Sequence, residues 1–284
     1  MRILLTGGSG FIGRHIVASL EKTYNVLSVN SNACDMLSQQ DITSLLESYK
    51  PTHCLHLAWN SGAGYADDVK NLNWLISSIY LVREFYRTGG ERFVGVGTCF
   101  EYADVAEPRS ENYTPTHPKT LYGKCKLALA DFLTAYAVGN SKSWAWCRPF
   151  YITGPGESLR RLVPSACLAF LKDNNFYTSA YSSVLDYMDV RDVAKSLIKI
   201  LLSCYCGVVN IGSGLGIKIS CLLSFLAKEI DTNGKVFPNT TSLQKNVSIV
   251  ANTDVLREKV GFIPRFSLHE TLNACLNDMR ERIK

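Results

Sequence analysis

A short apolar run that leads directly into a glycine-rich turn and a helix is the feature that most constrains the fold. The run Arg2–Thr6 is followed by Gly7, Gly10 and Gly13, and the apolar residues of segment 11–20 recur along one helical stripe. Glycine at these positions permits a tight turn, lets backbone N–H groups approach a ligand, and allows the helix to pack closely on the strand. Because a helix N-terminus also carries positive potential, the turn predicts a pyrophosphate site.

Strand-like and helix-like segments alternate through the first half of the chain. Strands are expected at 26–29, 54–58, 92–96 and 144–152, and helices at 42–49, 72–86 and 121–136. Ser38 and Asp41 form a start signal for the first of these helices, and Pro51 ends it. Such alternation implies a parallel sheet, and hence an α/β fold with a doubly wound parallel sheet of the Rossmann type.

The alternation loosens beyond Gly154. Helices are expected at 163–171, 193–202 and 220–230, with strand-like segments at 177–187 and 208–211. A capping box of Ser267 and Glu270 predicts a C-terminal helix. We therefore expect two domains, each made of two separate ranges of the chain. Residues 1–152 with 186–212 form the Rossmann domain that carries the glycine turn, and residues 153–185 with 213–284 form a smaller C-terminal substrate-binding domain.

Composition narrows the classes of partner. The chain has 284 residues, 46% of them hydrophobic, and its net charge of +5 comes without a block of Lys and Arg, so nucleic-acid or membrane-surface binding is not indicated. No stretch approaches the roughly 20 apolar residues of a membrane helix, and a cytoplasmic location is expected. The ten cysteines are scattered, and the nearest pair, Cys204 and Cys206, lacks metal-site spacing. We expect reduced structural thiols and no metal.

The end of the second expected strand bears on the choice of dinucleotide. An acidic residue usually stands there, where its carboxylate binds the ribose hydroxyls. Here the residue is Asn30, its neighbours at 31 and 32 are neutral, and Arg14 follows the last glycine. Nothing in this set repels a 2′-phosphate and one cation can attract it, so NADP(H) is favoured as the cofactor. The alternative is NAD(H), with Asn30 hydrogen-bonded to the ribose and Arg14 in solvent.

A tyrosine and a lysine lie four residues apart in the expected helix 121–136. This spacing projects the Tyr122 and Lys126 side chains from one helix face. A free tyrosine, with a pKa of about 10, is a poor acid or base at neutral pH, and an adjacent ammonium is expected to lower that pKa. Thr98 follows the strand 92–96 at the carboxyl edge of the sheet, where its hydroxyl can donate to a substrate carbonyl. The three residues predict carbonyl oxidoreduction.

Several further segments support a family resemblance. They are His56-Leu57-Ala58, Arg148-Pro149-Phe150, Arg161-Leu162-Val163-Pro164, Asp186-Tyr187-Met188-Asp189-Val190 and Asn210-Ile211-Gly212-Ser213-Gly214. Together with the glycine turn and the tyrosine–lysine pair, they make nearly the whole chain resemble the extended short-chain dehydrogenase/reductase family, in its nucleotide-sugar branch. The resemblance implies a nucleoside-diphosphate sugar as substrate. It also implies a homodimer formed through the long helices before and after Thr98.

The resemblance assigns further residues to the cofactor. It implies that Asp35 and Met36 contact the adenine, that Leu57 and Ala58 line the cofactor, and that Lys126 also holds the nicotinamide ribose. The complete set expected to bind the cofactor is Gly7, Gly10, Phe11, Ile12, Gly13, Arg14, Asn30, Asp35, Met36, Leu57, Ala58, Tyr122, Lys126 and Phe150.

The departures from the family pattern bear on the reaction. Members that eliminate water between positions 4 and 6 carry an Asp-Glu pair directly after the catalytic threonine, whereas this chain has Cys99 and Phe100. A dehydratase is therefore not expected. Segment 97–102 and the short connection between the second and third strands look most like reductases of nucleoside-diphosphate 4-keto-6-deoxyhexoses. An NDP-sugar epimerase that retains NAD is the alternative, and a catalytically silent dinucleotide-binding protein is the second alternative.

The substrate contacts are expected to differ from those of relatives. Tyr151 stands where many relatives have an asparagine that contacts the substrate phosphate, and Leu185 stands where an arginine often occurs. The diphosphate is therefore expected near Arg160 and Arg161, although both are equally compatible with a solvated helix start. Thr98 and Tyr151 complete the expected substrate-binding set.

Three features near these residues complete the picture. The polar, glycine-bearing segment 60–68 is a candidate lid, because such loops tend to line sites. Trp59, which precedes it, is expected near the substrate. Glu101 lies close enough to Thr98 to reach a ligand, but orienting Tyr102 is an equally good role, and we do not assign Glu101 to the site.

Overall fold

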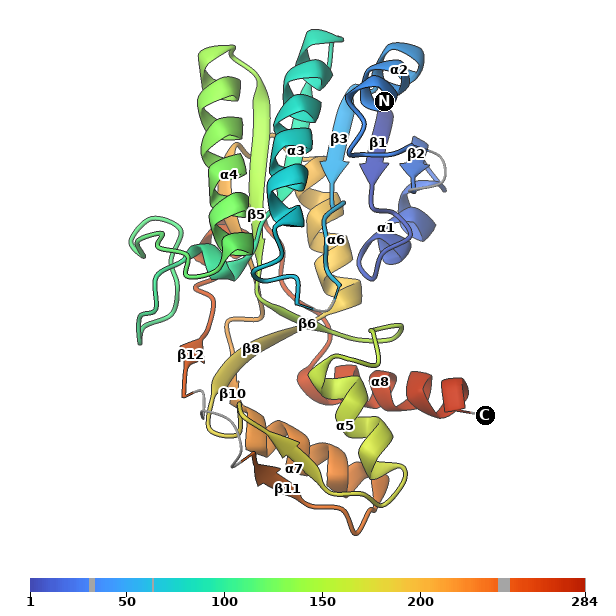
Figure 1. Cartoon of the computed structure of the whole chain (residues 1–284), viewed down its shortest axis with the longest axis vertical. Helices are drawn as coiled ribbons and strands as arrows, with labels where there is room; N and C mark the ends of the chain where they lie inside the picture. The colour runs from blue at the N-terminus through green and yellow to red at the C-terminus, as the bar shows by residue number, and fades with distance from the viewer. Residues whose placement is uncertain (31–33, 63, 240–245, 284) are drawn as a thin grey trace.

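Six parallel strands form the central sheet (Figure 1). The computed structural model describes residues 1–30, 34–62, 64–239 and 246–283. The strands are β1 (Arg2–Thr6), β2 (Asn25–Val29), β3 (His53–His56), β4 (Arg92–Val96), β5 (Ser143–Pro149) and β9 (Gly207–Ile211), in the order β2-β1-β3-β4-β5-β9. The order reverses between β1 and β3, and open α/β sheets bind ligands beside such a switch point, at the carboxyl ends of the strands.

Helices cover both faces of this sheet (Figure 1). One face carries α1 (Gly13–Leu20) and α6 (Val190–Leu201), and the other carries α2 (Gln39–Tyr49), α3 (Lys70–Arg87) and α4 (Leu121–Gly139). Side chains alternate between the faces, so that Ile3 and Leu5 of β1 enter one apolar cluster while Leu4 enters the other. The sheet is therefore buried on both sides. The doubly wound Rossmann-type fold predicted from the sequence is confirmed.

Helix starts follow the capping signals in the sequence. The Ser38 hydroxyl caps α2 by accepting a hydrogen bond from the Asp41 backbone N–H at 3.2 Å. Thr120 caps α4 in the same way through the Gly123 N–H at 3.1 Å. Since α4 carries the predicted catalytic tyrosine and lysine in its first two turns, this cap fixes where both side chains leave the helix.

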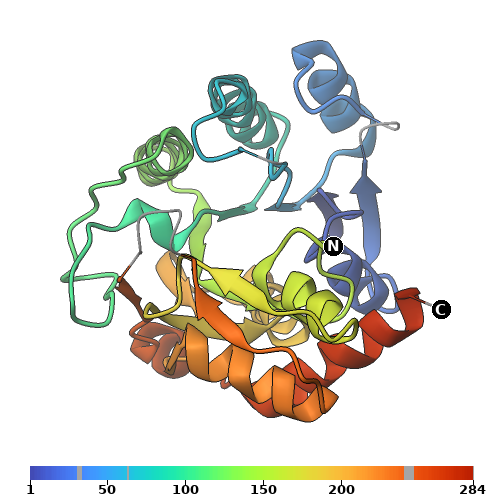
Figure 2. The ribbon, with the colours of Figure 1, turned by 60° about the horizontal axis from the view of Figure 1, so that its bottom comes forward.

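A smaller unit packs at the carboxyl edge of the sheet (Figure 2). It contains one sheet of β6 (Tyr151–Thr153), β8 (Val184–Asp189), β10 (Gly216–Lys218) and β12 (Ser248–Ile249), the pair β7 (Phe176–Thr178) and β11 (Val236–Pro238), and the helices α5 (Leu162–Phe170), α7 (Ile219–Ile230) and α8 (Leu268–Ile283). The capping box predicted before α8 is formed, with Ser267 Oγ accepting from the Glu270 N–H at 3.2 Å. None of the described helices has the length and apolarity to cross a membrane.

The segment expected as one strand at 144–152 splits between the two sheets. β5 ends at Pro149, which has no N–H to continue the ladder, and β6 begins at Tyr151 and pairs with β8. β8 also pairs with β10 and β12, so residues 186–189, which the sequence-based division placed in the Rossmann domain, hydrogen-bond within the smaller sheet. The remaining division into two domains stays a prediction. The chain passes from the central sheet to the smaller sheet between β5 and β6, and it returns from β8 to α6. These two passages hold the smaller unit against the carboxyl edge of the central sheet.

Glycine at position 95 in β4 is required by the Trp146 indole on the neighbouring strand. A Cβ atom there would lie 2.5 Å from the indole ring, whereas a Cβ at Gly139, at the end of α4, would meet nothing within 4 Å. We expect Gly95→Ala to lower the free energy of unfolding by about 1–3 kcal/mol through overpacking. Gly139→Ala is expected to leave it unchanged or to raise it by up to about 1 kcal/mol. Urea unfolding followed by circular dichroism measures both, and a Gly95→Ala variant as stable as the wild type contradicts the close β4–β5 packing.

Candidate active site

The glycine turn after β1 approaches neighbouring backbone too closely for any side chain. Gly7 has a φ of 74°, and a Cβ there would lie 2.8 Å from the Ala58 backbone N. A Cβ at Gly13 would lie 2.2 Å from the Gly7 carbonyl oxygen, to which the Gly10 N–H donates at 3.0 Å. Ile12 leads into α1 and packs against the first apolar cluster. The first amides of α1 open onto this turn, and the cradle fits the pyrophosphate of a dinucleotide.

A buried chain of hydrogen bonds joins the carboxyl ends of β1 and β3. The Thr6 hydroxyl lies 2.7 Å from His56 Nδ1 and accepts from the Ala58 N–H at 3.2 Å. On the other side of the ring, His56 Nε2 lies 2.9 Å from the Ser78 hydroxyl. Burial lowers the pKa of His56 to about 3, so the ring is neutral and acts as a structural link. The chain fixes Leu57 and Ala58, which are expected to line the cofactor, beside the glycine turn.

A groove of about 400 Å³ runs along the glycine turn and the end of β2. Its lining consists of Gly8, Ser9, Arg14, Val17, Ala18, Glu21, Ser28 and Asn30. The neutral neighbours of Asn30, at 31 and 32, lie outside the described residues. Asp35 is exposed and its carboxylate accepts from the Leu37 N–H at 2.9 Å, while Met36 is buried. The groove joins Asn30 and Arg14, the two residues on which the expected choice of cofactor depends.

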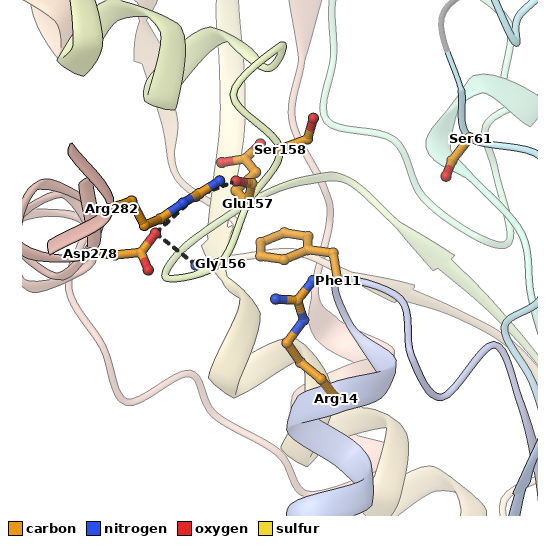
Figure 3. Close-up of a pocket in the computed structure, with 8 residues that line it drawn as sticks. All are labelled: Phe11, Arg14, Ser61, Gly156, Glu157, Ser158, Asp278 and Arg282. Carbon is orange, nitrogen blue, oxygen red and sulfur yellow. Dashed lines mark hydrogen bonds and ion pairs between the residues drawn. The ribbon is translucent and has the colours of Figure 1, made fainter. Parts of the chain in front are cut away.

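A second cavity, of about 470 Å³, lies between the glycine turn and the smaller unit (Figure 3). Its lining consists of Phe11, Arg14, Ser61, Gly156, Glu157, Ser158, Asp278 and Arg282. The Arg14 guanidinium faces Gly156, where a Cβ would lie 2.8 Å from Nη1. The Gly156 N–H donates to the Asp278 carboxylate of α8 at 3.0 Å, which holds the loop in place. Arg14 therefore borders both cavities, at the junction of the two units.

The three predicted catalytic residues come together beyond the carboxyl end of β4. Thr98 follows this strand, and its hydroxyl lies near enough to the Tyr122 phenol to influence the pKa of that phenol. Lys126, buried one turn further along α4, donates to the Val96 carbonyl at 2.8 Å. Its ammonium lies 3.8 Å from the centre of the Trp59 ring and 5.9 Å from the centre of the Tyr122 ring. The structure thus brings hydroxyl, phenol and ammonium groups to one place, and their catalytic roles stay a prediction.

The expected lowering of the Tyr122 pKa by Lys126 is wrong. Burial raises the pKa of the phenol well above its usual value, and nearby Tyr65 and Glu101 add to the rise. The nearby Thr98 hydroxyl opposes this rise of the pKa. Burial also lowers the pKa of Lys126 to about 7, since the ammonium is withdrawn from water. Desolvation therefore outweighs the attraction between the two groups, and Tyr122 is a neutral proton donor at neutral pH.

The loop between β3 and α3 covers the Tyr122 side chain. In the candidate lid 60–68, of which residue 63 lies outside the described part, the Tyr65 ring meets the Tyr122 ring edge to face at 5.0 Å. The Ala66 carbonyl accepts from the Tyr122 N–H at 2.8 Å. Trp59 also contacts Tyr122, with 6.4 Å between ring centres. Sequence reasoning singled out this loop by its composition but missed Tyr65, because one aromatic residue in a loop does not indicate which helix it will meet.

The residues expected to bind the substrate differ in their surroundings. The Arg161 guanidinium lies 5.4 Å from the centre of the Tyr65 ring, so this arginine faces the site. Arg160 is exposed, and no side-chain partner is found for it among the described residues. Tyr151 packs among other aromatic rings, and burial raises the pKa of its phenol. Phe150, expected at the cofactor, is buried in the apolar cluster of the smaller unit.

The fold and the cluster at its ligand edge place this chain among the dinucleotide-dependent α/β oxidoreductases. The chain belongs to the NAD dependent epimerase/dehydratase family, whose model matches residues 3–212. Over its whole length it is similar to the GDP-6-deoxy-D-mannose reductase of Pseudomonas aeruginosa, with 24% identity over 301 residues that cover 100% of this chain and 98% of the relative. The resemblance to the nucleotide-sugar branch of the family is confirmed, and the protein is an enzyme that uses a nicotinamide dinucleotide.

Two solved structures share the fold across essentially the full chain. The UDP-glucose 4-epimerase of Thermotoga maritima, determined with UDP-glucose, has a TM-score of 0.88 and 21% identity, and covers 100% of both chains. RMD from Pseudomonas aeruginosa, determined with NADPH, has a TM-score of 0.88 and 22% identity, and covers 99% of this chain and 98% of that one. At this level of identity the likeness establishes the fold.

Substitutions at Gly10 and Gly13 distinguish the effect of an added side chain on ligand binding from its effect on packing. Among the described residues, a Cβ at Gly10 meets the Gly7 carbonyl oxygen at 3.1 Å, whereas a Cβ at Gly13 comes within 2.2 Å of the same atom. We expect Gly13→Ala to lower Tm by about 5 °C or more. Gly10→Ala is expected to leave Tm nearly unchanged and to weaken dinucleotide binding about tenfold or more, because its methyl group faces the expected pyrophosphate. Thermal unfolding and fluorescence titration with NADPH measure the two effects, and equal losses in both variants count against the separation.

Proposed function

We propose that the protein reduces the C4 keto group of a nucleoside-diphosphate 4-keto-6-deoxyhexose with NADPH, in deoxysugar biosynthesis. The observation that carries the proposal is the neutral Tyr122 phenol, which lies beside Thr98 and has the buried Lys126 ammonium 5.9 Å from its ring centre. A neutral phenol suits reduction, in which this group must give a proton to a forming alkoxide. Relatives named GDP-6-deoxy-D-mannose reductase and GDP-6-deoxy-D-talose 4-dehydrogenase support the same substrate class.

The residues of the cluster divide the work of carbonyl reduction. The dinucleotide, when bound, supplies the hydride. The Thr98 hydroxyl and the Tyr122 phenol donate hydrogen bonds to the carbonyl oxygen, and Tyr122 transfers its proton as negative charge develops there. Lys126, whose ammonium is the prevailing form below about pH 7, binds the nicotinamide ribose and stabilises the phenolate that remains. Trp59 and Tyr65 exclude water from these groups.

The residues beside Thr98 favour reduction over dehydration. Elimination of water needs an acid and a base, and this chain offers Cys99 and Phe100 at the corresponding places. Burial raises the pKa of Cys99 to about 12, so the thiol stays neutral near pH 7 and does not act as a base. An epimerase that retains NAD stays the alternative, because the same cluster is able to oxidise a sugar first, and relatives named UDP-glucose 4-epimerase favour it.

The diphosphate of the substrate is assigned to the Arg161 side of the cluster. This guanidinium lies over the Tyr65 ring, which in turn contacts the Tyr122 ring. We therefore place the sugar of the substrate beside Tyr122 and its diphosphate toward Arg161. In this arrangement Thr98 is assigned to the sugar, and Tyr151 is assigned to the region between the sugar and the diphosphate. Arg160, which is exposed, remains in the predicted set as a contact that substrate binding draws in.

The protein is proposed to be a cytoplasmic homodimer. α3 and α4 lie side by side on one face of the sheet (Figure 1), and α3 leaves Leu72 and Ile76 exposed by 46% and 59%. These helices are the ones expected to pair with a second copy, and burying both side chains favours association. All ten cysteines are free, which suits a reducing compartment.

The first test supplies a nucleotide-linked 4-keto-6-deoxyhexose together with NADPH. Net loss of NADPH absorbance with formation of the 4-hydroxy sugar supports the reductase, and isomerisation without net NADPH consumption supports the epimerase. Tyr122→Phe should lower kcat by about 10²- to 10⁴-fold while leaving NADPH binding nearly intact, since it removes the general acid alone. Unchanged turnover in this variant refutes the assignment. The control is Tyr136→Phe on the same helix, whose ring stacks on Phe132, and it should retain wild-type turnover.

The choice of dinucleotide is proposed to be NADP(H). The groove at the end of β2 is bordered by Asn30 in place of a carboxylate and by Arg14, with Glu21 as the one acidic residue of its lining. We expect the Kd of NADPH to be about tenfold or more below that of NADH, because an arginine contact to a phosphate adds a charge-assisted hydrogen bond. Arg14→Ala should weaken NADPH binding and leave NADH binding nearly unchanged. A clear preference of the wild type for NADH, or an equal loss with both dinucleotides, contradicts a 2′-phosphate contact.

A further inference from the structure

A fully buried carboxylate lies at the end of the catalytic loop. Glu101 is the last residue of the short 3-10 helix η1 (Cys99–Glu101), and 0% of its surface is exposed. Among the described residues, it is not part of the lining of either cavity that borders the glycine turn. A buried charge is retained only where partners compensate the loss of water, so the partners of this carboxylate show what it holds in place.

Three N–H donors from two elements converge on the Glu101 carboxylate. The Thr98 backbone N–H donates to Oε1 at 2.9 Å, and Arg148 Nε donates to Oε2 at 2.7 Å. The Trp146 indole N–H lies 3.1 and 3.0 Å from the two oxygens. Gly97 leaves room for this network, since a Cβ there would lie 2.1 Å from Glu101 Oε1. Burial raises the pKa of the carboxyl, but the ion pair with Arg148 opposes it and the donors all favour the charged form.

The bond to the Thr98 backbone orients the Thr98 side chain. Glu101 and Thr98 form a reciprocal capping box around η1, in which the Thr98 hydroxyl also accepts from the Phe100 N–H at 3.3 Å. The Thr98 backbone is extended, with φ of −161° and ψ of 152°. The Thr98 hydroxyl, which lies near the Tyr122 phenol, is therefore fixed from the side of the backbone by a carboxylate that is ion-paired with Arg148 of β5.

The same negative charge acts on both reacting side chains. It favours the ammonium form of Lys126, against the burial that opposes that form, and it disfavours the phenolate form of Tyr122. His56, which also faces Lys126, is neutral. The other titratable groups around the carboxylate and its partners include Arg148, Tyr102 and Cys99, and beyond them Arg109, Glu111 and Asp186. The geometry agrees, because the Lys126 ammonium donates to the Val96 carbonyl at 2.8 Å and the Glu101 carboxylate accepts from the Thr98 N–H at 2.9 Å, so both charges are held on the same short backbone segment 96–98.

We propose that Glu101 is a positioning residue of the reductase: it holds the Thr98 hydroxyl toward Tyr122 and supplies the buried negative charge that favours the Lys126 ammonium. The kinetic part of this inference rests on the proposed function. The electrostatic part concerns the chain alone and holds for any reaction that the cluster performs.

Two variants separate the charge of Glu101 from its position. Glu101→Gln/Arg148→Met removes both members of the buried pair together, which avoids leaving one charge unpaired in the core. Glu101→Asp keeps the charge but is one methylene shorter, so its carboxylate cannot reach both the Thr98 N–H and Arg148. The control is Glu84→Gln/Arg87→Met on α3, away from the cluster, which removes a carboxylate with 5% exposure together with its 2.5 Å ion-pair partner. Arg83, the second ion-pair partner of Glu84, is half exposed and stays solvated.

The pH profile of kcat, measured at saturating NADPH and 4-keto sugar, distinguishes these roles. In the wild type, activity should fall as pH rises through about 7, where Lys126 loses its proton. The double variant at Glu101 should shift this alkaline limb to lower pH by about one unit and lower the maximal kcat about tenfold. Glu101→Asp should lower kcat with the limb unchanged, and the control at Glu84 should change neither. NADPH titration and Tm verify that each variant is folded.

A second readout does not depend on turnover. In protein labelled with ¹⁵N-lysine, the Lys126 Nζ resonance, assigned by its loss in Lys126→Met, should titrate near pH 7 and about one unit lower in Glu101→Gln/Arg148→Met. A folded double variant with the wild-type Nζ titration overturns the electrostatic role, and wild-type kcat in Glu101→Asp overturns the positioning role. A wild type without ketoreductase activity but with the Nζ shift refutes the proposed function and leaves the electrostatic role supported.

Discussion

Backbone contact between the ends of β1 and β3 is the constraint on which the site depends. Gly7 approaches the Ala58 backbone so closely that no Cβ fits, and the chain from Thr6 through His56 to Ser78 locks the two strand ends together. From this edge one connection enters α1 and forms the glycine turn proposed to bind the pyrophosphate, and the other becomes the loop that covers Tyr122 of α4. A single backbone junction therefore sets the distance between the proposed dinucleotide site and the cluster of Thr98, Tyr122 and Lys126.

Withdrawal from water, more than pairing of charges, sets the chemistry of the cluster. Trp59 and Tyr65, both in the loop between β3 and α3, cover the phenol and the ammonium. Burial shifts the pKa values of Tyr122 and Lys126 in opposite directions, each toward the neutral form. A neutral phenol is a proton donor, which is the form that reduction requires at the start of the reaction. The ammonium needs an opposing influence to stay protonated, and the buried Glu101 carboxylate supplies it.

Local sequence patterns predicted most of the fold, and they predicted that Thr98, Tyr122 and Lys126 meet at the carboxyl edge of the central sheet. Strand runs, the Ser38 cap and the glycine turn depend on residues close in sequence, so periodicity and spacing were sufficient to place them. Sequence patterns missed the split of segment 144–152 at Pro149, because it depends on the pairing of β6 with the distant strand β8. They also missed the contacts of Glu101, because its partner Arg148 is distant in sequence. The direction of the Tyr122 pKa was predicted wrongly for the same reason: spacing along a helix reveals a neighbour, whereas burial depends on a loop from elsewhere in the chain.

The position of the Glu101 carboxylate, three residues after Thr98, bears on which reaction the site is able to catalyse. Relatives that dehydrate their substrate carry acidic side chains directly after Thr98, whereas here these positions hold a neutral buried thiol and an aromatic ring. The nearest carboxylate comes later, at Glu101, and its hydrogen bonds turn it inward to Arg148. A carboxylate committed to an ion pair in the core is unavailable for proton transfer to a sugar carbon. In the proposed function the phenol is then the acid of the site, and a single acid next to a hydride donor is sufficient for reduction of a ketone and insufficient for elimination of water.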